Sequence, residues 1–427
     1  MDTPTRHSRI SGFHKLPIAQ RIEAVARFAG LDAAEQAHLA NTGNLPAELA
    51  DHLIENLVGT MNIPVGIATN MKVDGQDRLI PMATEESSVV AAVCNAARQC
   101  YDNGGFITSM SGTQMIAQIQ LTGVRDPEHA RIRILERRAE IQAICDECDP
   151  VLLRLGGGFR DLEVRVLATR GGAMVITHLV VDTRDAMGAN AVNTMAEKLA
   201  PSIAGWTGGQ TNLRILSNLA DRRLARARCV WRVSDIGGEA VRDAMVSAYH
   251  FADADPYRAA THNKGIMNGI SAVVLATGND TRAVEAGAHA YAARAGHYGS
   301  LTRWEVTNEG DLAGSIEVPM AVGLVGGATK LHPTARLSLK ILGVQTAEEL
   351  ARIIAAVGLA QNFSALKALA TTGIQKGHMA LHSKNIAMMA GAVGEEIDRV
   401  ARMLVEKGTV RIDVAEAELR ALRAAGA

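Results

Sequence analysis

The chain has 427 residues, of which 48% are hydrophobic and 21% are charged. This is the composition of a folded globular protein, and the length is that of two or three domains rather than one. Lys and Arg (44) nearly balance Asp and Glu (45), and the net charge of −1 argues against a protein that binds duplex nucleic acid through a basic surface.

The sequence also indicates a cellular location and a redox state. The N-terminal stretch MDTPTRHSRI has no apolar signal core, and no apolar run is expected to approach the ~18 residues that span a bilayer. We therefore expect a cytoplasmic protein without a membrane partner. The five cysteines include one C-x-x-C pair, Cys145 and Cys148, but a zinc site needs four ligands. Reduced thiols and no metal are the expectation.

The first 110 residues are predicted to be mostly helical, and the region after them has the most regular pattern. Period-two alternation predicts its strands, and Asp126-Pro127 is typical of a helix start. The order β-α-β-β-α-β predicts a ferredoxin-like domain. In chain order its expected elements are a strand at 115–124, a helix from 126 to about 145, strands at 161–169 and 173–183, a helix from about 186 that stops before Pro201, and a strand at 212–220.

The second half of the chain begins with small and polar residues at 255–280, where the apolar run SAVVLATG is expected to be a strand. A glycine-rich stretch follows at 322–330, and the chain is then predicted to be helical to its end. Residues 394–407 form an amphipathic helix in this interpretation, and Gly408 ends it.

The stretch ATHNKGIMNG (260–269) places Lys264 among small and polar residues. A lysine in such surroundings is often an ordinary surface charge. Arg258, six residues earlier, and Asn268, four residues later, add donors that suit a carboxylate or an acyl oxygen of a ligand. Both interpretations stay open on these residues alone.

Carboxylates occur in two further segments of interest. Glu85 and Glu86 are expected in the first turn of a helix, where negative charge is favourable; the alternative is an acid that passes a proton to a carbonyl oxygen. Asp280 follows the apolar run before it, and is either a turn or cap residue or a carboxylate paired with Lys264.

His378 and His382 share one face of an expected helix. The pair lacks the glutamate of H-E-x-x-H and has no evident third ligand, so a general acid is the better interpretation. Glycines at 156–158 and 326–327 let the backbone approach a ligand, but neither cluster is a dinucleotide-binding G-x-G-x-x-G. RDAMGAN (184–190) lies at an expected strand-to-helix junction, where helix N-terminal amides bind phosphate.

Taken together, these segments resemble hydroxymethylglutaryl-coenzyme A reductase, specifically its soluble bacterial class (class II). The resemblance covers essentially the whole chain, and DAMGAN combined with HNKG is very specific. In family order, the matching segments are ENLVGT (55–60), EESSVVAA (85–92), DAMGANAVNTMAE (185–197), DPYRAATHNKGIMNG (255–269), ATGND (276–280), VGLVGGATK (322–330) and GHMALH (377–382).

The resemblance implies a role for each matching catalytic residue. Lys264 matches the lysine that polarises the thioester carbonyl and stabilises the mevaldyl oxyanion, and Glu86 matches the group that exchanges a proton with that oxygen. Asp280 matches the aspartate that joins the two in one hydrogen-bonded network. His378 matches the histidine that protonates the departing coenzyme A thiolate, whereas no role transfers to His382.

The resemblance also implies contacts with substrate and cofactor. The residues that match those holding the hydroxymethylglutaryl carboxylate and hydroxyl are Ser88, Arg258 and Asn268. The residues that match those contacting the nicotinamide dinucleotide are Asp149, Asp185, Met187, Gly188, Asn190, Asn218 and Gly326.

Two positions bear on how this chain differs within the family. Relatives commonly have proline where this chain has Ser87, and its loss softens the loop without removing an acid group. Asp149 matches an acidic residue that some soluble relatives place on the adenosine ribose. A carboxylate there accepts both ribose hydroxyls and repels a 2′-phosphate, so NAD(H) is expected rather than NADP(H). Arg154 and Arg160 are the basis of the alternative, a phosphate site.

The implied fold is α+β: a large, mostly helical catalytic domain (1–110 and 221–375), an inserted ferredoxin-like βαββαβ NAD-binding domain (111–220), and a C-terminal helical flap (376–427). The implied reaction interconverts mevalonate plus coenzyme A with hydroxymethylglutaryl-coenzyme A by two hydride transfers. A homodimer or higher homo-oligomer is implied, with active sites between subunits. The alternative is an acyl-coenzyme A binding protein without catalysis, or a lyase-like protein without redox chemistry.

Overall fold

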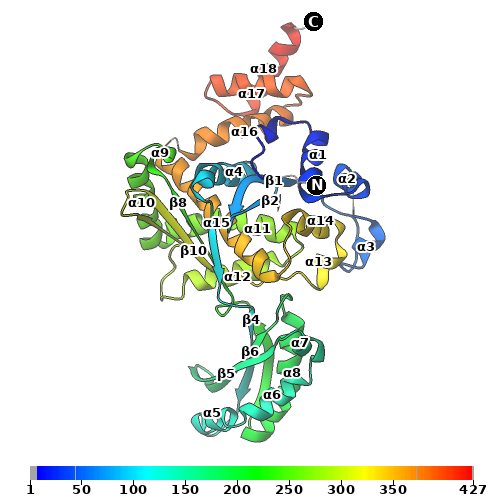
Figure 1. Cartoon of the computed structure of the whole chain (residues 1–427), viewed down its shortest axis with the longest axis vertical. Helices are drawn as coiled ribbons and strands as arrows, with labels where there is room; N and C mark the ends of the chain where they lie inside the picture. Colours follow the sequence, from blue (N-terminus) through cyan, green and yellow to red (C-terminus); the bar gives the residue numbers. More distant parts are fainter. Residues whose placement is uncertain (1–6, 44, 372, 426–427) are drawn as a thin grey trace, which may run out of the picture.

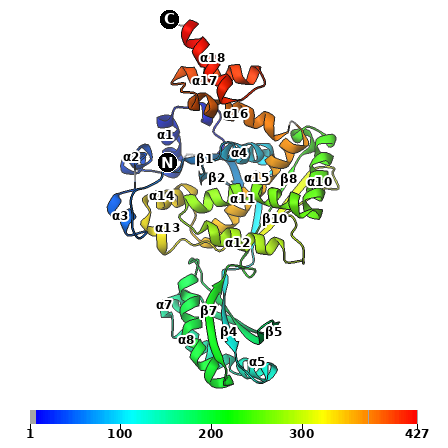
Figure 2. The ribbon, with the colours of Figure 1, turned by 180° about the vertical axis from the view of Figure 1, so that it is seen from behind.

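The computed structural model describes residues 7–43, 45–371 and 373–425, without the side chains of residues 328, 374–381 and 425. The molecule is elongated, with a main body in the middle and a smaller part at each end (Figure 1). One end is a sheet with its helices, which we call the projecting unit (residues 114–217). The other end is formed by α16 (Ile374–Met389), α17 (Glu395–Glu406) and α18 (Ile412–Ala425). The view from behind shows the same arrangement (Figure 2).

The projecting unit is an antiparallel sheet with strand order β5-β6-β4-β7, and its helices pack on one face. This confirms the predicted βαββαβ order. Its apolar side chains form a cluster separate from that of the main body. The elements are β4 (Gln114–Thr122), α5 (Pro127–Leu135), α6 (Arg138–Asp146), α7 (Pro150–Arg154), β5 (Gly158–Thr169), β6 (Gly172–Asp182), α8 (Ala189–Thr207) and β7 (Gln210–Ser217).

Two helix boundaries in the projecting unit differ from the sequence prediction. The single helix expected from 126 to 145 is two helices, α5 and α6, although Asp126 caps the first as expected by accepting a hydrogen bond from the His129 N–H (3.0 Å). The helix expected to stop before Pro201 continues as α8 to Gly208, which has left-handed backbone (φ 72°). Buried α8 side chains on both sides of Pro201 pack against the sheet, which offsets the missing backbone hydrogen bond.

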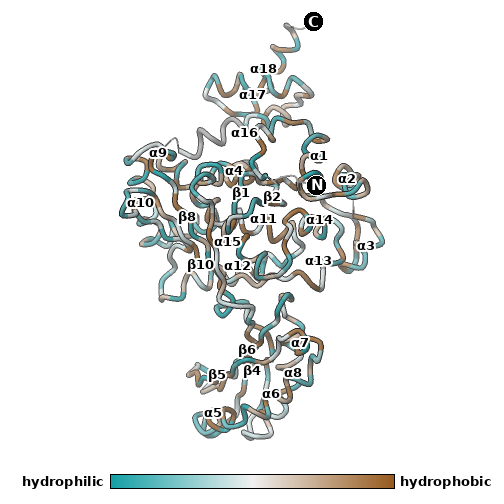
Figure 3. The backbone as a smooth tube through the Cα atoms, in the orientation of Figure 1, coloured by the Kyte–Doolittle hydropathy of each residue, from teal (hydrophilic) through white to brown (hydrophobic). Residues whose placement is uncertain are grey.

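The main body is built around α15 (Ala347–Ala370), whose central residues are buried among helices and strands. Phe363 on this helix stacks on Trp231 with ring centroids 4.3 Å apart, and Trp304 lies 5.4 Å from Trp231. By length and hydropathy α15 passes as a membrane span, so the expectation that no apolar run approaches this length was wrong. Its apolar window is, however, 67% buried within the molecule. Figure 3 shows brown, apolar stretches recurring in these central elements.

Two small sheets and several helices enclose α15. The four-stranded sheet has the order β3-β8-β10-β9, and β1 pairs with β2. The strands are β1 (Val65–Val73), β2 (Gln76–Ala83), β3 (Ile107–Met110), β8 (Leu224–Trp231), β9 (Thr302–Val306) and β10 (Leu312–Pro319). The helices are η1 (Phe13–Lys15), α1 (Ile18–Ala29), α2 (Ala33–Ala40), α3 (Ala47–Asp51), α4 (Val89–Cys100), η2 (Tyr101–Asn103), α9 (Val233–Ile236), α10 (Glu239–Ala254), α11 (Pro256–Ala276), α12 (Thr281–Ala292), α13 (Gly327–Leu331) and α14 (Pro333–Leu342).

The main body overturns two details of the sequence prediction. The first 110 residues are not mostly helical, because they also contain β1, β2 and β3. The apolar run before Asp280 is not a strand but the last two turns of α11. Asp255 caps this helix and Pro256 occupies its first turn, a helix start like the one recognised at Asp126.

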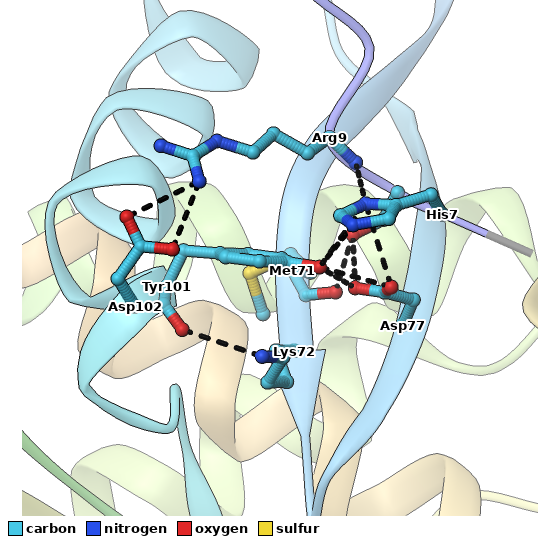
Figure 4. A network of polar contacts seen from close by, with 8 residues as sticks. His7, Arg9, Met71, Lys72, Asp77, Tyr101 and Asp102 are labelled. Carbon is cyan, nitrogen blue, oxygen red and sulfur yellow. Dashed lines mark hydrogen bonds and ion pairs between the residues drawn. The ribbon is translucent and has the colours of Figure 1, made fainter.

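The described N-terminal segment is fastened to the β1–β2 hairpin (Figure 4). Ser8 is fully buried and its hydroxyl donates to Asp77 (2.8 Å), which also accepts a hydrogen bond from the Tyr101 hydroxyl (2.7 Å). Burial and this hydrogen bond raise the pKa of Tyr101, so the phenol stays protonated. The Lys72 ammonium lies 4.2 Å from the centre of the Tyr101 ring, and Arg9 pairs with Asp102 on the outside. The network joins the start of the described chain to the main body.

The C-terminal helices α16–α18 have an apolar cluster of their own. The predicted amphipathic helix at 394–407 is confirmed as α17, whose buried residues include Val400 and Leu404, and Gly408 follows it with φ 63°. The ion pair between Lys384 and Asp398 (2.6 Å) links α16 to α17.

Candidate active site

Lys264 is paired with Glu86 rather than isolated on the surface. Its Nζ donates to Oε2 of Glu86 at 2.8 Å, and Nδ2 of Asn268 lies 3.4 Å from the same oxygen. Lys264 and Asn268 share a face of α11 because they are four residues apart. The side chains of Lys264 and Glu86 are 61% and 38% exposed, so a ligand can reach the pair. The structure therefore brings together three of the residues singled out in the sequence.

The orientation of Lys264 is set by its two buried neighbours on α11. His262 is 2% exposed and its Nε2 is hydrogen-bonded to the Thr302 hydroxyl (2.9 Å). Asn263 is fully buried and donates to the carbonyl of Gly299 (2.9 Å). Because these two side chains point into the body, the next residue along the helix faces outward. The polar sequence HNK thus combines two internal anchors with one exposed cation.

Glu86 lies in the turn before α4, not in the first helical turn as the sequence suggested. The helix begins at Val89, and Ser88 is its N-cap with left-handed backbone (φ 77°). The Ser88 hydroxyl is buried and has no hydrogen-bond partner within the described part of the chain. A non-glycine residue with positive φ and an unpaired buried hydroxyl are both features found where ligands bind. Ser88 is thus a structural candidate for a ligand contact.

Arg258 provides a second cation on α11, one and a half turns before Lys264. Its side chain is partly buried, and burial lowers its pKa from the ordinary value, although a guanidinium stays charged at neutral pH. Among the described residues no carboxylate forms an ion pair with it. A charged group that is partly desolvated and unpaired is suited to an anionic ligand group.

Asp280 lies at the start of α12. Its Oδ1 accepts hydrogen bonds from the N–H groups of Arg282 (3.0 Å) and Ala283 (3.1 Å), which makes it the N-cap of α12. Although burial raises its pKa, these bonds and the Arg282 guanidinium lower it overall, so the carboxyl is ionised. In the described part of the chain, no hydrogen bond or ion pair joins Asp280 to Lys264 or Glu86.

The two histidines of GHMALH lie on α16, as predicted. The side chain of His378 lies outside the described residues, so we place it only by its position on α16. His382 is described and exposed.

The turn between β6 and α8 packs against the main body. Gly188 is the N-cap of α8 with φ 99°, and a Cβ there would lie 2.3 Å from Cγ2 of Thr183, so only glycine fits. Asp185 does not extend toward solvent, because its Oδ1 accepts a hydrogen bond from the Ala347 N–H (2.8 Å). Met187 packs into the apolar cluster of the projecting unit, whereas Asn190 is exposed in the first turn of α8.

Arg223 holds this turn in place and was not singled out from the sequence. It is fully buried and donates to the Thr183 hydroxyl (3.0 Å), the Ala186 carbonyl (3.0 Å) and the Val322 carbonyl (2.5 Å). Burial lowers its pKa to about 10, which leaves it charged at neutral pH. No local pattern distinguishes it from Arg222 beside it, because its partners are backbone groups far away in the sequence.

The remaining predicted cofactor residues are spread over three places. Asp149 caps α7 by accepting a hydrogen bond from the Leu152 N–H (2.9 Å). Asn218 is exposed after β7, and its carbonyl lies against Gly287 of α12. Gly326 is exposed with φ 87° before α13, and no atom lies within 4 Å of the position of a Cβ there.

The arginines that could receive a phosphate near Asp149 differ in their surroundings. Arg160 is hydrogen-bonded to the Gly156 carbonyl and lies 3.4 Å from a carboxylate oxygen of Asp182. Arg154, in the last turn of α7, forms no hydrogen bond or ion pair in the described part of the chain. Of the two arginines, Arg154 therefore has the guanidinium that remains available to a phosphate.

Comparison with known proteins gives one consistent result. A family model described as hydroxymethylglutaryl-coenzyme A reductase matches residues 17–383. A 3-hydroxy-3-methylglutaryl-coenzyme A reductase of Archaeoglobus fulgidus is 57% identical over 416 residues, which are 97% of this chain and 95% of that protein. A probable enzyme of the same name from Borreliella burgdorferi is 39% identical over 345 residues, covering 78% of this chain and 77% of that protein.

Solved structures agree with these relatives. The 3-hydroxy-3-methylglutaryl-coenzyme A reductase of Streptococcus pneumoniae superposes with a TM-score of 0.83 at 40% identity, covering 96% of this chain and 99% of that one. A structure of the class II enzyme from the same organism, bound to NADPH in open conformations, gives a TM-score of 0.81 at 40% identity, with 96% and 100% coverage.

Arg223→Met should destabilise the protein by about 2–4 kcal/mol, because buried acceptors that lose their donor each cost about 1–3 kcal/mol. The free energy of unfolding from urea titration measures the effect. Arg222→Met is the matched control, since Arg222 is 50% exposed and pairs with Glu163 on the surface. Its cost should stay below about 1 kcal/mol. Equal losses in the two variants would contradict the role assigned to Arg223.

The stability of the protein should fall on acidification partly because of His262. Burial, with a contribution from Arg258, lowers its pKa from 6.5 to about 3. Between these values the unfolded chain binds a proton that the folded chain excludes, so the free energy of unfolding decreases as pH falls through this window. The slope from one such group reaches about 1.4 kcal/mol per pH unit.

His262→Gln should therefore reduce the difference in unfolding free energy between pH 7 and pH 5, as measured by urea titration at both values. Among the described residues, His38, His178 and His332 also have a pKa that burial lowers, and they keep their share of the slope. His129→Gln is the control because that side chain is exposed. An unchanged difference in the His262 variant would contradict this explanation.

Proposed function

We propose a reaction centre for this chain on the premise that it belongs to the hydroxymethylglutaryl-coenzyme A reductase family, class II type. The protein is an oxidoreductase acting on hydroxymethylglutaryl-coenzyme A and mevalonate with a nicotinamide cofactor. The observation that carries the proposal is the contact between Lys264 and Glu86 at 2.8 Å, which joins a cation on the exposed face of α11 to a carboxyl group in the turn before α4.

Lys264 has the charge that this reaction requires. Reduction of a thioester to an alcohol passes twice through negative charge on the same oxygen, and a fixed ammonium stabilises both states. Glu86 lies beside the ammonium, so its carboxyl is placed to give a proton to that oxygen or to take one from it. The pair is exposed, so the substrate carbonyl can approach both side chains from the solvent side.

The substrate carboxylate and hydroxyl fit the groups that lack partners in this structure. Arg258 offers an unpaired guanidinium, Ser88 an unpaired buried hydroxyl, and Asn268 an amide that reaches Glu86 only at 3.4 Å. Together they would hold the hydroxymethylglutaryl end while Lys264 acts on the thioester carbon's oxygen. We propose Asp280, at the start of α12, as the third charged group of this reaction centre.

The thiolate of coenzyme A leaves between the two reductions, and this step needs an acid. His378 is proposed for it because a histidine donates a proton readily near pH 7. Its position on α16, in the C-terminal helices 376–427, would let the acid arrive with closure of this part over the substrate. We propose 376–427 as a flap, 111–220 as the cofactor domain, and 1–110 with 221–375 as the catalytic domain.

The nicotinamide cofactor supplies the hydride when bound. The start of α8 fits its phosphate groups, because the N–H groups of the first helical turn lack helical partners and Asn190 is exposed there. Met187, Asn218 and Gly326 are proposed as further contacts. Asp185 is proposed to act through the backbone it holds, since its carboxylate is bound to the Ala347 N–H.

We propose that the protein is a homodimer or higher homo-oligomer with active sites between subunits. We also propose that it lies in the cytoplasm. Val58 and Met61 are 103% and 86% exposed, and Tyr257, next to Arg258, is 87% exposed. We propose that another protein surface covers these large exposed apolar side chains. A second copy of the chain is the partner that the family resemblance implies.

The function is tested by nicotinamide absorbance on adding mevalonate and coenzyme A with either NAD or NADP. Lys264→Ala should remove nearly all turnover of hydroxymethylglutaryl-coenzyme A and of free mevaldehyde, because both reductions place charge on the oxygen that Lys264 stabilises. A loss of about 10²–10³-fold is the scale expected for such a group. His378→Ala should impair the thioester far more than mevaldehyde, which has no thiolate to release.

The two variants are controls for each other, and Lys15→Ala, an exposed lysine of η1, should behave as the unmodified protein. No absorbance change with either cofactor would refute the reductase activity itself. Normal turnover in Lys264→Ala would refute the reaction centre, and equal losses on both substrates in His378→Ala would refute the proton donor.

We propose NAD(H) as the preferred cofactor, with Asp149 as the residue that selects it. One of its oxygens caps α7, which fixes the carboxylate in place for the ribose hydroxyls. The Streptococcus pneumoniae relative is bound to NADPH, which supports the opposite choice. In that alternative, we propose Arg154 as the residue that receives the 2′-phosphate.

Asp149→Ala should reduce the ratio of kcat/KM for NADH over NADPH, because the repulsion of a 2′-phosphate is removed. Arg154→Ala is the contrasting variant and should leave that ratio high. If the unmodified protein prefers NADPH, and Arg154→Ala abolishes this preference, the cofactor assignment is reversed.

A further inference from the structure

A cavity of about 790 Å³ lies on the outer face of the β3-β8-β10-β9 sheet, beside the connection from α12 to β9. It is apart from the Lys264–Glu86 pair, since neither residue lines it. The sheet stands at one side of the main body in Figure 1. Cavities of this size hold whole small molecules.

The sheet register places two arginines in one row on the cavity floor. Ser315 of β10 pairs with Arg228 of β8 on one side and with Arg303 of β9 on the other. Neighbouring strands are about 4.8 Å apart, so the two arginine Cα atoms are separated by about 10 Å with a serine between them. Residues in one row point to the same face, so the side chains of Arg228 and Arg303 leave the sheet on either side of Ser315.

Neither Arg228 nor Arg303 is neutralised. Both are exposed, and within the described part of the chain neither forms an ion pair or a side-chain hydrogen bond. Glu317, which also lines the cavity, is already engaged by Arg226 (2.6 Å) and by the Tyr291 hydroxyl.

The balance of charge in the cavity is positive. Its lining includes four arginines, at 226, 228, 294 and 303, and two carboxylates, Asp253 and Glu317. Arg294 lies 4.0 Å from Glu317 as well, so the carboxylate that is present on the floor is shared among cations. Two guanidinium groups facing a hydroxyl are a suitable set of donors for a phosphate group.

The rest of the lining indicates what the phosphate is attached to. Ile107, which is 49% exposed, contributes apolar surface, and the volume exceeds what an inorganic phosphate fills. Two arginines about 10 Å apart can each bind one end of a diphosphate or converge on one phosphate. We propose that this cavity is a binding site for a phosphorylated small molecule, a phosphate or diphosphate ester with a short organic body, held by Arg228 and Arg303.

Isothermal titration calorimetry of the full chain at fixed ionic strength tests the site. The probes are inorganic pyrophosphate and n-butyl phosphate, and inorganic phosphate is the comparison without an alkyl group. Both should bind the unmodified protein, and n-butyl phosphate should bind more tightly than inorganic phosphate because its alkyl group reaches the apolar wall. Replacing both arginines, R228Q with R303Q, should weaken binding by about 100-fold, on the scale of about tenfold for each charged hydrogen-bond donor lost.

Two further variants make the outcome decisive. Arg170→Gln, an exposed arginine in the β5–β6 turn, should leave binding unchanged. Lys264→Ala should also bind both probes normally, because the cavity does not include that lysine. The site is overturned if the unmodified protein binds neither probe, or if binding survives in the double variant. It is also overturned if binding is lost in Lys264→Ala, which would place the anion in the reaction centre. Equal affinity for n-butyl phosphate and inorganic phosphate would contradict the claim that the ligand carries an organic group.

Discussion

The orientation of α11 is the constraint on which the reaction centre depends. His262 and Asn263 are polar, yet both are buried and hydrogen-bonded to the segment 299–302, so α11 has one rotational setting in the main body. A buried polar group without its partner costs about 1–3 kcal/mol, so other rotations of the helix are strongly disfavoured. The exposed face of α11 then carries the cation and the amide that meet Glu86.

The segment 299–302, which holds the buried side of α11, also lines the cavity of the β3-β8-β10-β9 sheet. Gly299 and Ser300 line that cavity, and Gly299 also accepts the hydrogen bond from Asn263. The anchoring of α11 and the wall of the cavity are therefore one piece of backbone. The buried side of the helix separates this wall from the exposed face that presents Lys264.

The projecting unit is also held by a buried polar side chain, Arg223, as α11 is held by His262 and Asn263. Arg223 donates to backbone carbonyls from both the β6–α8 turn and the segment before α13. Asp185 accepts from the N–H at the start of α15 in return. The turn expected to meet the cofactor is thus held by the main body, so cofactor and substrate surfaces are built on connected backbone.

Local patterns were enough to predict the projecting unit, the cap at Asp126 and the amphipathic helix α17, because alternation, caps and helical stripes depend on near neighbours. The motifs HNKG and DAMGAN likewise identified the family and the residues to consider. Helix boundaries such as Pro201, and the helical state of the run before Asp280, were missed because tertiary packing overrode the local preference. Only the folded chain decided that Lys264 contacts Glu86 directly, 178 residues away, and that Arg223 is buried. These outcomes depend on contacts between distant segments, which no local sequence pattern encodes.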